Sequence, residues 1–231
     1  MKKLKGKSSS SWMTTRQRFP ENREAGIMGY TIIRVLLDLF FFHILRLHVE
    51  GEENIPSKGA VIIAANHKSY FDPPLVGVAF HNRRLSYMAK SELFRNPLFG
   101  WLIRKLGAFP VKRNSADMGA IRQSVRIIKG GEPLLIFPEG GIVHGRALSR
   151  FHPGMAFLAI LTGTPVIPAA IIGSEPLPKR KGKLAVLIGK PVEVKKARPD
   201  DRNTKELDGL VKERIQAMID AYEKGNSVPF L

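Results

Sequence analysis

A histidine and an aspartate stand five residues apart in residues 66–72, which read NHKSYFD. A neutral imidazole can take a proton from a hydroxyl group, so His67 is a candidate general base. If the loop folds back, the Asp72 carboxylate accepts the Nδ1 proton of His67 and leaves Nε2 free for that reaction. The same residues also fit a plainer structure, in which Asn66 caps a helix and the histidine is bonded to the backbone.

The nucleophile for such a site is expected to come from the substrate. Ser69 lies in the same loop, but the sequence contains no G-x-S-x-G turn of the kind that presents a catalytic serine. The chain has no cysteine, which excludes a thiol nucleophile, disulfides and zinc-thiolate sites. Its six histidines show no metal-ligand spacing such as H-E-x-x-H. We therefore expect a substrate hydroxyl as the nucleophile, with no metal and no cofactor.

A second stretch, residues 107–113, ends in two cations. The guanidinium of Arg113 can hold a phosphate through two parallel hydrogen bonds, and Lys112 adds positive charge beside it. Solvated surface charge explains the same pair equally well. Lys112 and Arg113 are therefore candidate phosphate-binding residues.

Two further stretches follow or form apolar strands. Residues 136–141 read IFPEGG, so a strand runs into a turn where Gly140 could bring its bare backbone close to an anion. Glu139 adds a carboxylate at the same turn. Residues 163–170 form an apolar pattern broken by prolines, which suits a sheet edge or the wall of a tunnel.

The segments that must position these groups alternate between strand and helix patterns. Apolar runs predict strands at residues 59–65, 85–89, 108–112, 133–137, 166–172 and 184–188. Helical spacing predicts helices at residues 97–106, 116–129, 155–161 and 202–224. This alternation indicates an α/β fold with a mixed, largely parallel sheet flanked by helices. Ligands of such folds bind at the carboxyl ends of the strands.

The first 48 residues have a different character from the rest. Residues 27–45 are mostly apolar but include Arg34, Asp38 and His43. A spanning helix needs about 20 mostly apolar residues, so three ionisable groups in this window predict a tilted segment or insertion from one side. Arg34 and Asp38 are four residues apart and can pair on one helix face. A buried core helix is the alternative.

A basic, serine-rich arm precedes this window, and three phenylalanines, residues 40–42, lie within it. Cations on anionic headgroups combined with apolar insertion are the two signals of a membrane anchor. The arm lacks the apolar core and cleavage site of a signal peptide. We expect a membrane-associated helical segment in residues 1–48 on the cytoplasmic face of a membrane, followed by an α/β domain in residues 49–231.

The overall charge narrows the range of partners only when it is combined with the motifs. The 231 residues suit one substantial domain, and 37 lysines and arginines against 20 acids give a formal charge of +17. The positive electrostatic field of such a protein attracts nucleic acid, anionic lipid or phosphorylated substrates. The sequence offers no reading helix, zinc module or RNA-binding strand pattern, so no nucleic-acid partner is expected.

Taken in order, the four stretches resemble the four motif blocks of the glycerolipid acyltransferases. The residues that carry the resemblance are Asn66, His67 and Asp72 in the first block, Gly107, Val111 and Arg113 in the second, Phe137 to Gly140 in the third, and Pro165 to Pro168 in the fourth. The similar region extends from about residue 50 to residue 178. One block alone would be weak support, whereas four in order are strong support.

The resemblance implies transfer of a fatty acyl group from acyl-CoA or acyl carrier protein to the sn-2 hydroxyl of lysophosphatidic acid, a membrane lysophospholipid. It implies that His67 deprotonates the hydroxyl and Asp72 orients His67. Arg113 and Lys112 would hold the acceptor phosphate. Asn66, Glu139 and Gly140 would complete the substrate-binding site.

One position departs from the family pattern. The third block usually continues with an arginine where this chain has Ile142, so a cation for the acceptor is missing from its usual place. Arg146 or Arg150 could substitute for it. Another lysolipid therefore remains an alternative acceptor. A lipid hydrolase that uses water as the nucleophile and a basic binding protein without catalysis are the remaining rivals.

Overall fold

The computed structural model describes residues 23–112, 117–145, 147–177 and 182–231, and its seven described strands form one sheet. In chain order the strands are β1 His48–Glu50, β2 Ile62–Ala65, β3 Ser86–Lys90, β4 Ala108–Val111, β5 Leu134–Ile136, β6 Val166–Ile172 and β7 Ala185–Ile188. Their order across the sheet is β1-β7-β6-β2-β5-β3-β4. Only the β6–β7 pairing is antiparallel, which confirms the predicted mixed, largely parallel sheet.

All six predicted strands are present within a few residues, and β1 is an additional one. Its three residues alternate two polar side chains, His48 and Glu50, around Val49. Such a short and polar pattern carries no strand signal by itself. β1 forms because the parallel edge of β7 lies beside it, with His48 opposite Ala185.

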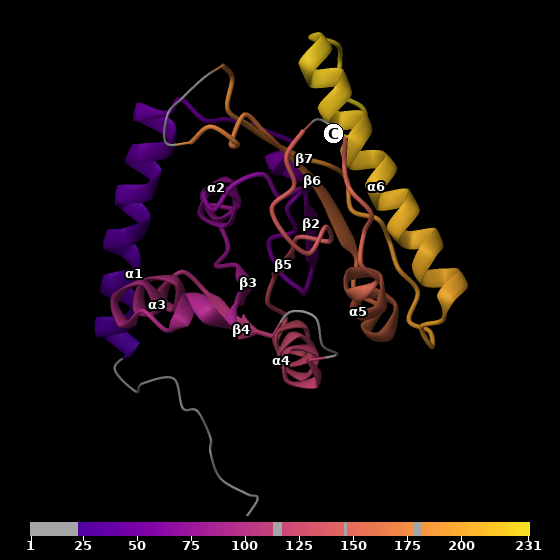
Figure 1. The fold of residues 1–231 in the computed structure, drawn as a ribbon, viewed down its shortest axis with the longest axis horizontal. Helices are drawn as coiled ribbons and strands as arrows, with labels where there is room; N and C mark the ends of the chain where they lie inside the picture. Colours follow the sequence, from indigo (N-terminus) through magenta and orange to yellow (C-terminus); the bar gives the residue numbers. More distant parts are fainter. Residues whose placement is uncertain (1–22, 113–116, 146, 178–181) are drawn as a thin grey trace, which may run out of the picture.

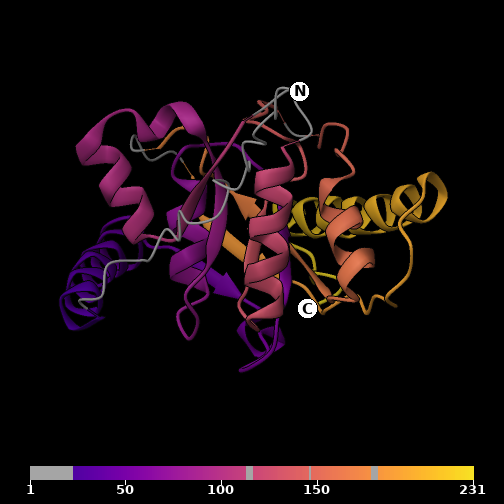
Figure 2. The same cartoon turned by 90° about the horizontal axis from the view of Figure 1, so that it is seen from below.

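Helices cover both faces of this sheet. In chain order they are α1 Arg23–Asp38, α2 Asp72–Ala79, α3 Pro97–Lys105, α4 Met118–Lys129, α5 Gly154–Thr162 and α6 Asp201–Lys224. Figure 1 shows α1, α2 and α3 on one side of the strands and α5 and α6 on the other. Figure 2 shows α1 and α3 at one end of the molecule and α6 at the other.

Two apolar cores follow from the alternation of side chains along the strands. In β2, Ile63 and Ala65 point to the core beneath α2, whereas Ile62 and Ala64 point to the core beneath α5 and α6. Each of these residues is fully buried. A strand buried on both faces reads as a continuous apolar run, which is why residues 60–65 contain no polar side chain.

The segment that follows α1 does not place its phenylalanines at the lipid surface. A π-helical turn, Leu39–Ile44, continues α1, and Phe41 within it is fully buried in the core beside α2. Leu45 joins the same core. The expectation that residues 40–42 contact lipid is therefore wrong for Phe41. The π-helical turn directs the Phe41 ring toward the core, and the apolar sequence of residues 39–42 alone does not predict this direction.

The described helices include none that is both long enough and apolar enough to span a bilayer. Within α1, the predicted pair forms, since Arg34 Nε donates to Asp38 Oδ1 over 2.8 Å. The other guanidinium nitrogens donate to the carbonyl oxygens of Gly77 (2.8 Å) and Val78 (2.9 Å), in the last turn of α2. Arg34 thus satisfies carbonyl groups that have no partner within α2 and ties α1 to that helix.

Asp208 is a buried carboxyl group in the contact between α6 and α5. Burial raises its pKa from 3.8 to about 6, although the Ala156 backbone N–H of α5 acts in the opposite direction. Its Oδ1 has no hydrogen-bond partner within the described part of the chain. The folded protein therefore binds this proton more tightly than the unfolded chain does, and the stabilisation is present below pH 4 and is lost as the pH rises through 6.

Asp208→Asn is expected to raise the melting temperature at pH 7.5 and to leave it unchanged at pH 4. The amide keeps the acceptor for Ala156 and removes the buried charge, a gain on the order of 1 to 3 kcal/mol at neutral pH. Thermal unfolding of both proteins across this pH range measures the effect. Asp220→Asn, an exposed position on the same helix, is the control, and equal shifts in the two variants would contradict the prediction.

Candidate functional site

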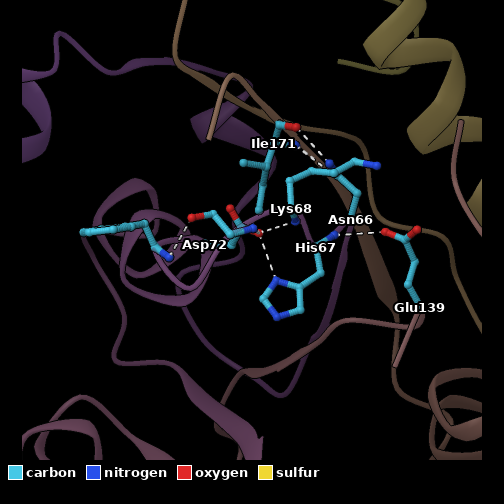
Figure 3. Close-up of polar contacts among 8 residues, drawn as sticks. Asn66, His67, Lys68, Asp72, Glu139 and Ile171 are labelled. Atoms are coloured by element: carbon cyan, nitrogen blue, oxygen red, sulfur yellow. Dashed lines mark hydrogen bonds and ion pairs between the residues drawn. The ribbon is translucent and has the colours of Figure 1, made fainter. Parts of the chain in front are cut away.

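His67 and Asp72 are hydrogen-bonded in the loop between β2 and α2. His67 Nδ1 lies 2.9 Å from Asp72 Oδ2, and Figure 3 marks this contact with a dashed line. Because an ionised carboxylate only accepts hydrogen bonds, Nδ1 carries the proton and Nε2 keeps a free lone pair. The side chain of His67 is 10% exposed, whereas that of Asp72 is fully buried. The pair therefore has the arrangement required of a general base and its orienting carboxylate.

The loop folds back because one oxygen atom of Asp72 collects several donors. Its Oδ2 also accepts the backbone N–H groups of Lys68 (2.6 Å) and Ser69 (2.7 Å). Asp72 is the first residue of α2, and the two prolines that follow it occupy the first turn, where a missing N–H costs nothing. The N-terminal end of the helix dipole further favours the negative charge at this position.

Phe137 fixes the plane of the His67 ring from the neighbouring strand end. The two rings stack with centroids 4.2 Å apart and planes 20° apart. Phe137 directly follows β5, which pairs with β2 in parallel, so the two residues meet at the same edge of the sheet. The apolar ring forms a wall beside the imidazole and limits its rotation.

Asn66 binds backbone atoms of the other neighbouring strand. Its Nδ2 donates to the Ile171 carbonyl over 2.8 Å, and its Oδ1 accepts the Ile171 N–H over 2.7 Å. The side chain is completely buried. Asn66 therefore connects the end of β2 to β6 directly beneath His67, rather than presenting its amide to solvent.

Glu139 connects two loops through its carboxylate. Oε1 accepts the backbone N–H of His67 over 3.0 Å, and Oε2 accepts the backbone N–H of Ser149 over 2.9 Å. The following residue, Gly140, has φ of +73°, and a Cβ atom there would lie 2.7 Å from the His152 ring. Both the left-handed backbone and this close approach require glycine.

Residues 141–145, which we call the strap, lie beside the loop of residues 66–72, which we call the catalytic loop for its proposed role. The Val143 N–H donates to the carbonyl of His67 over 2.9 Å, and the ammonium of Lys68 donates to the carbonyl of Gly145 over 2.7 Å. Lys68 is not among the site residues that the sequence predicts. Its position between His67 and Asp72, inside the first motif, was the signal that could have identified it.

Lys112, a candidate phosphate-binding residue of the second stretch, lies at the edge of the sheet. Lys112 is exposed after β4, an edge strand three positions from β2, which corresponds to about 14 Å between strand axes. Its backbone N–H donates to Asp117, and this bond, with those from Ala120 and Gly119, lowers the pKa of the Asp117 carboxyl. Arg113 lies outside the described residues. Within the described chain, no three acidic or histidine side chains are arranged to hold a metal ion.

Comparison with known proteins gives a consistent result for the region around this site. Residues 46–172 match the family model described as Acyltransferase. The chain is 33% identical over 147 residues to the 1-acyl-sn-glycerol-3-phosphate acyltransferase of Bacillus subtilis, covering 62% of this chain and 72% of that protein. It is 31% identical to the Streptococcus pneumoniae protein of the same name, over 65% of this chain and 56% of that protein.

Two further similarities bear on acceptor and fold. A lyso-ornithine lipid O-acyltransferase of Pseudomonas aeruginosa is 30% identical, over 72% of this chain and 62% of that protein. Among solved structures, the crystal structure of the 1-acyl-sn-glycerophosphate (LPA) acyltransferase from Thermotoga maritima aligns with a TM-score of 0.67 and 26% identity. That alignment covers 85% of this chain and 82% of the other.

Proposed function

Because the chain belongs to the acyltransferase family, we propose that it transfers a fatty acyl group from a thioester donor to the sn-2 hydroxyl of lysophosphatidic acid, giving phosphatidic acid. The donor is acyl-CoA or acyl carrier protein. The observation that carries the proposal is the 2.9 Å contact between His67 Nδ1 and the buried Asp72 carboxylate, at the carboxyl end of a central strand.

The reaction proceeds by direct attack of the acceptor on the donor. His67 Nε2 takes the proton of the sn-2 hydroxyl as its oxygen attacks the thioester carbonyl carbon. The charge of Asp72 stabilises the imidazolium that forms. Collapse of the tetrahedral intermediate breaks the carbon–sulfur bond, and the departing thiolate takes the proton back from His67. The products are the new ester and a free thiol.

The remaining site residues act by holding this loop or by binding the acceptor. Asn66 and Glu139 are positioning residues in this proposal, because their polar atoms contact the backbone of Ile171, His67 and Ser149. Gly140 allows the turn after β5. Lys112 and Arg113 remain proposed contacts of anionic substrate groups, on the strength of the resemblance in the second motif block.

A panel of acceptors assayed with one acyl-CoA tests the proposed reaction. The purified protein should release thiol only when a lysolipid is present, and lysophosphatidic acid should give the highest kcat/KM. Thiol release without any acceptor would indicate a hydrolase. Lyso-ornithine lipid belongs in the panel as the second candidate acceptor. The Pseudomonas aeruginosa relative is named a lyso-ornithine lipid O-acyltransferase, and this chain has Ile142 where the family pattern usually has an arginine.

We further propose that the protein contacts the cytoplasmic face of a membrane through α1 and α3. Ile32, Val35 and Leu36 of α1 are at least half exposed, and α3 adds Leu98 and Trp101, which are 76% and 50% exposed. The two helices contact each other at one end of the molecule. Exposed apolar side chains on two contacting helices, in a protein with a formal charge of +17, fit an anionic bilayer.

The double variant Ile32→Glu/Leu36→Glu is expected to weaken binding to anionic liposomes by at least about tenfold, since each side chain loses about 1.5 to 3 kcal/mol of apolar burial in lipid. Flotation with vesicles of phosphatidylglycerol and phosphatidylcholine measures this. Leu210→Glu on α6, at the opposite end of the molecule, is the matched control. Unchanged flotation of the double variant would place the membrane contact elsewhere.

A further inference from the structure

We propose that Lys68 binds the phosphate group of the acceptor and thereby selects phosphorylated lysolipids. This inference rests on the proposed function, because it concerns the same site. It adds a specificity-determining residue that lies inside the first motif and that the motif itself leaves undefined.

Lys68 is a largely buried residue, and the protein satisfies its ammonium only in part. The residue is 8% exposed, and its Nζ donates one hydrogen bond, to the carbonyl of Gly145. An ammonium has three donors, so two remain available. No carboxylate in the described ranges forms an ion pair with it. Two remaining donors on a cation suit the oxygen atoms of an anionic ligand such as a phosphate.

The position of this ammonium is fixed relative to the catalytic base. The Lys68 backbone N–H donates to Asp72 Oδ2, the same atom that binds His67 Nδ1. Its side chain is held at the other end by the strap, which is itself bonded to the carbonyl of His67 through Val143. Base and cation therefore belong to one hydrogen-bonded unit.

The chemistry of the acceptor matches this unit. Only a few covalent bonds separate the sn-2 oxygen of a lysophosphatidic acid from its phosphorus, so a base and a phosphate-binding cation must lie close together. His67 and Lys68 are adjacent residues of one loop, and both are bonded to the same oxygen atom of Asp72. Lys112, three strand positions away at the sheet edge, lies about 14 Å from the axis of β2. The strap residues 141–145 contain no lysine or arginine.

Lys68→Gln removes the positive charge but can keep the hydrogen bond to the strap, because the glutamine amide can still donate to the carbonyl of Gly145. For lysophosphatidic acid, this variant should raise KM by about 10- to 100-fold, the range for losing a charge-assisted hydrogen bond. For a monoacylglycerol acceptor, which lacks phosphate, kcat/KM should stay within about threefold of the wild-type value. Ile142→Arg in the Lys68→Gln background returns a cation to the strap and should recover part of the loss.

Lys58→Met, an exposed lysine between β1 and β2, is the matched control, and circular dichroism verifies folding of each variant. Should Lys68→Gln not fold, Lys68→Arg, which keeps the charge, is compared with wild type and should retain the preference for the phosphorylated acceptor. Equal losses for both acceptors, or no loss for either, would overturn the inference. A wild-type protein that ignores lysophosphatidic acid but acylates another lysolipid would instead refute the proposed function.

Discussion

His67→Ala is expected to lower kcat for acyl transfer by about 10² to 10⁴, the usual contribution of a positioned general base. Nε2 is the ring nitrogen of His67 that keeps a free lone pair, because Nδ1 faces Asp72 Oδ2. Alanine leaves the carboxylate with its two backbone donors, so the loop keeps its anchor. The fold should therefore survive while proton removal from the acceptor fails.

Steady-state rates of thiol release with saturating acceptor measure this effect, and thermal unfolding verifies that the variant is folded. His81→Ala is the matched control, since His81 is half exposed and faces Glu52, away from the catalytic loop. A folded His67→Ala protein with near-normal turnover would remove His67 from the mechanism.

Asp72→Asn is expected to lower kcat by about 10² or more while changing KM for the acceptor little, because a neutral amide cannot stabilise the imidazolium that forms during attack. The Asn oxygen can still accept the backbone N–H groups of Lys68 and Ser69. The shape of the loop is thus retained, and the missing element is the negative charge at the ring.

Asp200→Asn provides the comparison for Asp72→Asn. Asp200 caps α6 by accepting the N–H groups of Arg202 and Asn203, so it is a carboxylate that binds backbone N–H groups without a histidine partner. Asp200→Asn should cost about 1 kcal/mol or less of helix-capping stability. Only Asp72→Asn should slow the reaction. Equal kcat values in the two variants would leave Asp72 with a structural role only.

The hydrogen bond between His67 and Asp72 could be predicted from sequence because both groups lie in one short loop. The loop has few ways to close, and a carboxylate five residues after the histidine meets it when the chain turns into a helix. The sheet could be predicted for a similar reason, since strands and helices alternate along the chain. Their catalytic roles stay predictions until the two variants are measured.

Contacts between distant segments could not be predicted. The bond between Glu139 and the backbone of His67 joins residues that are 72 positions apart, and nothing in the local sequence of either residue indicates it. The Arg34–Asp38 pair follows from helix spacing, but the bonds from Arg34 to α2 do not. The burial of Phe41 likewise depends on the neighbouring helix rather than on local sequence.

Asp72 Oδ2 also bears on how such a protein can evolve. The single Oδ2 atom of Asp72 contacts His67 and also accepts the two backbone N–H groups that close the loop before α2. A substitution that removes this oxygen is therefore expected to lower stability and turnover together, and selection acts against such changes. The strap has no strand or helix and is joined to the catalytic loop through backbone carbonyls. Because these contacts use backbone atoms of residues 141–145, side-chain substitutions there are expected to leave them in place, so acceptor preference can change without loss of the His67–Asp72 pair.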